Sequence, residues 1–92
     1  MIDTASTLVH AIDALKDARA KEIFVCATHA ILSGDGTSRL ANAPVAEVVV
    51  SNTVPIPEEG MSPKFTVLSV GEHLASAIRS IHEGSSVSQI FV

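Results

Sequence analysis

The sequence predicts a single α/β domain with a largely parallel sheet and helices on both faces. Segments with helical periodicity alternate with short, continuous apolar runs, which are typical of strands buried on both sides. The apolar share is 47%, but Trp and Tyr are absent and only three Phe occur, so small aliphatic residues must form the core. Ninety-two residues suffice for one domain near the lower limit of a self-sufficient core.

Periodicity predicts the elements of the first half of the chain. Apolar side chains at helical spacing indicate a helix, two continuous apolar runs indicate strands, and a turn cluster at residues 33–37 leads into a short helix that Pro44 ends. In chain order we expect a helix at residues 4–18, a strand at 22–28, a helix at 37–43 and a strand at 47–51.

The second half is expected to begin with an irregular loop at residues 53–63, which holds three prolines and a glycine. A shorter strand follows at residues 65–70. Leu74, Ile78 and Ile81 mark a final helix at residues 72–82, and Gly84 lies just past its end. The serines that follow read as a frayed tail.

Composition excludes several functional classes. The net charge is −4, and no Lys/Arg cluster or aromatic platform indicates nucleic-acid binding. The longest apolar run is far short of a membrane span, and the N-terminus lacks signal-peptide features, so we expect a cytoplasmic protein without membrane contact. Cys26, the single cysteine, is expected to be buried in its strand. The four histidines show no metal-ligand spacing with it, so no metal site is expected.

Two segments should lie where parallel sheets bind ligands, at the carboxyl ends of strands. The first is Asp3-Thr4-Ala5-Ser6-Thr7, which either caps the first helix through Asp3 or Thr4 or cradles a phosphate with helix N-terminal amides. The second is Thr28-His29 followed by Ser33-Gly34. His29 either bonds to nearby backbone or serves as a ligand or an acid–base group.

Four sequence segments, taken in order, show a resemblance to a known family that no single segment would establish. They are Asp-Thr-Ala-Ser-Thr-Leu at 3–8, Val-Cys-Ala-Thr-His-Ala-Ile-Leu-Ser-Gly at 25–34, Val-Val-Val-Ser-Asn-Thr-Val-Pro at 48–55, and the segment from Leu-Ala-Ser-Ala-Ile-Arg through Gln-Ile-Phe at 74–91. Together they resemble the C-terminal part of phosphoribosyl pyrophosphate synthetases, the ribose-phosphate pyrophosphokinases. The resemblance implies that residues 1–92 form a partial type I phosphoribosyltransferase-like domain that lacks its first strands.

The resemblance implies a reaction and two sites. The family transfers the diphosphoryl group of Mg-ATP to ribose 5-phosphate, which gives phosphoribosyl pyrophosphate and AMP. Its loop for the 5-phosphate falls on Asp3, Thr4, Ala5, Ser6 and Thr7, with Asp3 expected to orient the loop or to face ribose and metal. A candidate regulatory phosphate or ADP site falls on Ser86, Val87, Ser88 and Phe91.

The sequence departs from the family pattern at two glycines, where it has Ser6 and Arg19. The family's adjacent acids, ATP-binding residues, magnesium ligands and basic catalytic loop all lie upstream of Met1. We therefore expect no catalytic residue or metal ligand in this chain, no activity of the chain alone, and a homo-oligomer for the full-length family. A non-catalytic regulatory relative or a phosphate-binding α/β module remains an alternative, while the long match after the loop disfavours a salvage phosphoribosyltransferase.

Overall fold

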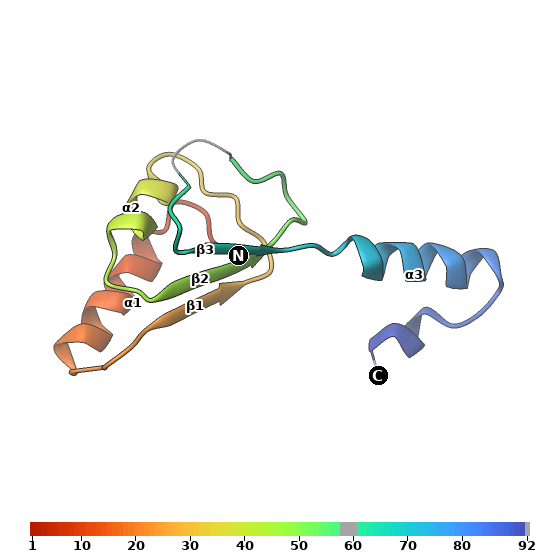
Figure 1. Ribbon diagram of the computed structural model, residues 1–92, viewed down its shortest axis with the longest axis horizontal. Coiled ribbons are helices and arrows are strands. Elements are labelled where there is room, and N and C mark those ends of the chain that lie inside the picture. Colours follow the sequence, from red (N-terminus) through yellow and green to blue (C-terminus); the bar gives the residue numbers. More distant parts are fainter. Residues whose placement is uncertain (58–60, 92) are drawn as a thin grey trace.

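A computed structural model describes residues 1–57 and 61–91, the side chain of Phe91 excepted (Figure 1). The elements in chain order are α1 (Ser6–Asp17), β1 (Phe24–Ala27), α2 (Gly36–Asn42), β2 (Glu47–Ser51), β3 (Phe65–Leu68), α3 (Gly71–His82) and the 3₁₀ helix η1 (Val87–Phe91). The strands are arranged in the order β1-β2-β3 and both pairs are parallel. The predicted α/β class with a parallel sheet is therefore confirmed. β1 and β3 are shorter than the predicted runs, and the tail predicted to be frayed forms η1.

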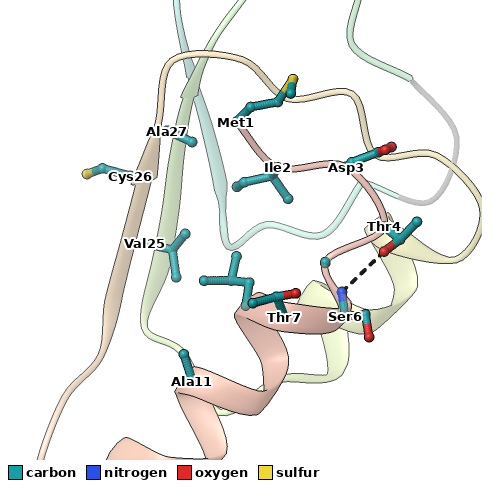
Figure 2. A pocket seen from close by; sticks show the side chains of 12 residues that line it. Met1, Ile2, Asp3, Thr4, Ser6, Thr7, Ala11, Val25, Cys26 and Ala27 are labelled. Carbon is teal, nitrogen blue, oxygen red and sulfur yellow. Dashed lines mark hydrogen bonds between the residues drawn. The ribbon is translucent and has the colours of Figure 1, made fainter.

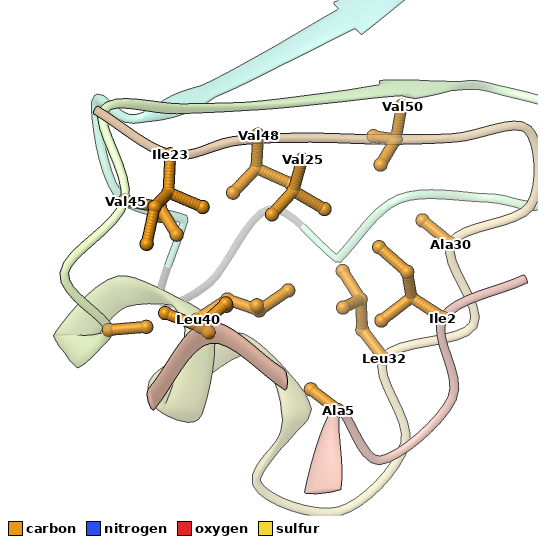
Figure 3. Packing of buried hydrophobic residues seen from close by; sticks show 12 residues of the cluster. Ile2, Ala5, Ile23, Val25, Ala30, Leu32, Leu40, Val45, Val48 and Val50 are labelled. Carbon is orange, nitrogen blue, oxygen red and sulfur yellow. The ribbon is translucent and has the colours of Figure 1, made fainter. Parts of the chain in front are cut away.

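The core lies between one face of the sheet and the helices α1 and α2. Val25 of β1 is paired with Val48 of β2, so both side chains point to the same side. Figure 3 shows these valines and Val50 directed to the same side of the sheet, where Leu40 of α2 and Leu32 lie. Ile12 of α1 completes this layer, and it is buried together with Leu40. Period-2 alternation thus assigns half of each strand to the core.

The opposite face of the sheet is open, so the prediction of helices on both faces is wrong for the described residues. Phe24 is 60% exposed and Leu68 is 57% exposed on this face. Cys26 lies there too and is exposed, which corrects the expectation that its thiol is buried. A continuous apolar run hides which of its residues face a helix layer, because alternation is visible only when polar residues mark one side.

Helix α3 extends away from the end of β3, and η1 lies beside it (Figure 1). The periodic apolar residues of α3 predicted this helix correctly, but they do not pack on the sheet. Ile78 is 68% exposed and Ile81 is 71% exposed. Among the described residues, no helix is long and apolar enough to span a membrane.

Two helices end in the same hydrogen-bonded motif. At the end of α1, the Arg19 and Ala20 N–H groups donate to the carbonyls of Lys16 and Leu15 at 2.9 and 3.0 Å. The end of α3 repeats this pattern around Gly84. Both central residues are left-handed, with φ of +67° at Arg19 and +73° at Gly84. This is the Schellman arrangement, which favours glycine because an L side chain is strained there.

We predict that Leu40→Ala lowers the free energy of unfolding by about 2–5 kcal/mol, because it leaves a cavity at a fully buried position. Leu74→Ala is the matched control on α3, where the leucine is 59% exposed. This control should change stability by less than about 0.5 kcal/mol. Urea unfolding measures both changes, and equal losses would contradict the assignment of the core.

We predict that Arg19→Gly raises the free energy of unfolding by about 1 kcal/mol, because glycine removes the strain of a left-handed residue. Lys16→Gly, three residues earlier and inside the regular helix, should instead lower it by about 1 kcal/mol. Urea unfolding at unchanged m-value distinguishes the two. A loss of stability in Arg19→Gly would argue against the Schellman motif.

Candidate functional site

The loop formed by residues 3–7 is anchored at the carboxyl edge of the sheet. Ile2 forms a parallel bridge with Ala30, three residues beyond the end of β1. The Ile2 N–H donates to the His29 carbonyl at 2.8 Å, and the Ile31 N–H donates to the Ile2 carbonyl at 2.8 Å. Since ligands of open α/β sheets bind beyond the carboxyl ends of the strands, this pairing puts the loop in a favourable place for binding.

The loop turns into α1 at Ala5. Ala5 is the N-cap residue, with φ of +67°, and it makes no side-chain capping bond. The Ser6 N–H donates to Thr4 Oγ1 over a long 3.4 Å. The interpretation in which Asp3 or Thr4 is the N-cap residue is therefore wrong. The amides of the first turn have no carbonyl acceptor within the helix, so they are oriented as donors for a further group.

Asp3 is directed toward the chain that follows β1. Its Oδ1 accepts a hydrogen bond from the Ser33 hydroxyl. The two predicted segments, residues 3–7 and Ser33-Gly34, thus meet in the fold. A carboxylate held in this way is turned toward the loop's own support, which suits a residue that orients the loop.

Two residues of α2 that the sequence did not single out contact the same loop. Arg39 Nη1 donates to the Thr4 carbonyl at 2.9 Å. Gly36 lies so close to the loop that a Cβ there would be 2.8 Å from the Asp3 carbonyl oxygen. No local pattern reveals these contacts, apart from the presence of a glycine at the start of a helix.

A pocket of about 470 Å³ lies between the loop, the first turns of α1 and strand β1. Its lining consists of residues 1–8, Ala11 and residues 25–27. Figure 2 shows Val25 and Ala27 facing the loop, while the Cys26 side chain points to the other side of β1. Thr4, Ser6 and Thr7 line it where α1 begins, and its volume suits a small ligand.

The model of one protein family, the phosphoribosyl synthetase-associated domain, matches residues 1–92, so the chain belongs to that family. That is the family of this protein. The ribose-phosphate pyrophosphokinase of Caldanaerobacter subterraneus subsp. tengcongensis is 52% identical over 91 residues, 99% of this chain and 29% of that protein. The Bacillus subtilis ribose-phosphate pyrophosphokinase is 45% identical over the same share of both chains.

A solved structure agrees with the sequence comparison. The crystal structure of phosphoribosylpyrophosphate synthetase from Mycobacterium smegmatis matches with a TM-score of 0.89 and 41% identity. The match covers 92% of this chain and 28% of that one. This domain therefore spans less than a third of the length of the relatives that it matches.

A second polar cluster of the domain joins the ends of β1 and β2. His29 Nδ1 is 2.7 Å from Thr53 Oγ1, and Ser51 Oγ donates to the Thr28 carbonyl at 2.5 Å. The imidazole of His29 is thus hydrogen-bonded to a hydroxyl. One of the two interpretations of the sequence expected it to bond to nearby backbone instead. A pocket of about 530 Å³ opens beside Thr28 and Ser51. The sequence did not single out Ser51 and Thr53, although polar residues at the end of an apolar strand are a recognisable signal.

The C-terminal residues matched to a regulatory site lie apart from the loop. Ser86 Oγ and Ser88 Oγ are 2.7 Å from each other, at the start of η1. Figure 1 shows η1 beside α3, at the end of the molecule opposite α1 and α2. Val87 is half-buried. The side chain of Phe91 lies outside the described residues.

No three His, Cys, Asp or Glu side chains in residues 1–57 and 61–91 are grouped so that they could hold a metal ion. The described residues therefore offer no cluster of three such side chains to the magnesium ion that the resemblance implies.

Proposed function

We propose that this chain is the C-terminal part of a ribose-phosphate pyrophosphokinase and that residues 3–7 hold the 5-phosphate of ribose 5-phosphate. The observation that carries the proposal is the left-handed turn at Ala5, at the carboxyl edge of the sheet. It directs the chain into α1, so that the first-turn amides and the positive end of the helix dipole lie at one point.

The loop offers a phosphate several donors. The amides of Ser6 and Thr7 have no carbonyl acceptor within the helix, and the only bond of the Ser6 amide among the described residues is the long one to Thr4 Oγ1. The hydroxyls of Thr4 and Thr7 can rotate toward the same anion. Ser6 stands where the family has glycine, and it begins α1 with ordinary helical geometry. The positive φ falls on Ala5 instead, so Ser6 adds a hydroxyl without adopting a left-handed conformation.

The proposed reaction is diphosphoryl transfer from Mg-ATP to ribose 5-phosphate. Catalysis of phosphoryl transfer rests on positioning and on cationic stabilisation of the transferred group. The described residues supply a positioning loop and no metal-ligand cluster. We assign ATP, magnesium and the catalytic groups to other parts of a complete, cytoplasmic, homo-oligomeric enzyme, and a regulatory phosphate or ADP site to Ser86, Val87, Ser88 and Phe91.

We predict that the 92-residue chain binds ribose 5-phosphate with a dissociation constant on the order of 1 mM and does not bind ribose. Thr7→Val, which removes one hydroxyl with little change in shape, should weaken binding about tenfold. Thr37→Val is the matched control, since Thr37 is also the second residue of its helix. Isothermal titration calorimetry measures all three. An absence of heat at tens of millimolar ligand, or equal losses in both variants, would contradict the phosphate site.

We predict no phosphoribosyl pyrophosphate from the chain alone in a coupled assay with Mg-ATP and ribose 5-phosphate, because the groups that stabilise the transferred phosphates lie elsewhere. A complete relative assayed in parallel controls for the coupling enzymes. Robust turnover by the 92-residue chain would contradict the assignment of the catalytic groups to other parts of the enzyme.

A further inference from the structure

Three residues between the end of β1 and the last turn of α2 meet the backbone or side chain of Asp3 and Thr4. They are Ser33, Gly36 and Arg39, spaced three residues apart. Residues three apart lie on one face of a helix, so Gly36 and Arg39 face the loop together. The loop therefore rests on a support that belongs to a distant part of the sequence.

The contact of Arg39 falls at the position that controls the turn. Arg39 Nη1 donates to the Thr4 carbonyl at 2.9 Å. That carbonyl belongs to the peptide group between Thr4 and Ala5, and the orientation of this group sets φ of Ala5. Ala5 adopts φ of +67°, which an L residue keeps only when its surroundings hold it.

Arginine suits this task. Its guanidinium is always charged, has donors only, and presents them in a rigid plane. A hydrogen bond from a charged donor to a carbonyl is stronger than one between neutral groups. Gly36 complements it, since a side chain there would press on the Asp3 carbonyl and push the loop away.

We propose that Arg39 is a positioning residue of the phosphate loop, which holds the Thr4–Ala5 peptide group so that Ala5 keeps its left-handed turn and the Ser6 and Thr7 amides face the ligand. Arg39 acts through the loop and not on the ligand. The ligand half of this inference rests on the proposed function. The conformational half concerns the ligand-free chain and is testable by itself.

The first test uses the ligand-free, full 92-residue chain. The intraresidue HN–Hα cross-peak of Ala5 in a NOESY spectrum is strong only when φ is positive. It should be strong in the unaltered chain and in Arg79→Ala, the matched control at an exposed arginine of α3, and should weaken in Arg39→Ala. Arg39→Lys should recover part of it, because an ammonium can still donate to the carbonyl.

The second test titrates the same proteins with ribose 5-phosphate and with inorganic phosphate, followed through the amide shifts of Ser6 and Thr7. Arg39→Ala should weaken both ligands about tenfold, the loss expected for one charge-assisted hydrogen bond. Arg79→Ala should leave the dissociation constants unchanged. Arg39→Lys should fall between the unaltered chain and Arg39→Ala.

A second variant keeps the arginine and displaces the loop. Gly36→Ala puts a Cβ 2.8 Å from the Asp3 carbonyl oxygen and should also weaken the Ala5 cross-peak. Gly71→Ala is its control, because Gly71 likewise begins a helix and its added Cβ would meet only the rotatable Ser69 hydroxyl, at 3.1 Å. If Arg39→Ala does not fold, the comparison of Gly36→Ala with Gly71→Ala tests whether the support from α2 holds the turn at Ala5.

The outcomes separate the two proposals. An unchanged Ala5 cross-peak in both Arg39→Ala and Gly36→Ala overturns the positioning role. Weaker binding in Arg39→Ala with an unchanged cross-peak also overturns it, because the arginine would then act on the ligand. If the unaltered chain binds no ribose 5-phosphate but Arg39→Ala still loses the cross-peak, the phosphate site fails and the positioning role stands.

Discussion

The attachment of residues 2–4 to the chain that follows β1 is the constraint on which the candidate site depends. Ile2 is held by backbone hydrogen bonds, Asp3 by a serine hydroxyl and Thr4 by Arg39. These contacts join residues that are about 30 positions apart in the chain, so they require an assembled sheet and α2. The strained turn at Ala5 is therefore supported by tertiary contacts, and the direction of the first α1 amides follows from it.

Within the described part of the chain, helices cover only one face of the sheet. Val48 and Val50 are almost fully buried against α1 and α2, whereas Phe24 and Leu68 on the other face are largely exposed. Parallel strands that read as continuous apolar runs are suited to cover on both faces. The chain spans less than a third of the length of the curated relatives that it matches. The open face of the sheet and the exposed apolar residues of α3 are described for this part alone.

Local signals predicted most of the elements. The β2 bounds agree at both ends, and α1 and α3 agree within two residues, because helical spacing and a left-handed stop are encoded within one or two turns. Arg19, with φ of +67°, is the left-handed stop of α1. The N-cap residue and the exposure of Cys26 were predicted wrongly. Both depend on which groups approach from elsewhere in the fold.

The sequence by itself determined the α/β class, the order of the elements and the family, since periodicity and ordered motifs are local or linear properties. It also singled out the loop at residues 3–7. Only the tertiary structure decided which face of the sheet is covered, that Ala5 carries the turn, and that Gly36 and Arg39 support the loop. Such contacts depend on chain segments that folding brings together, and the spacing of residues within one segment carries no record of them.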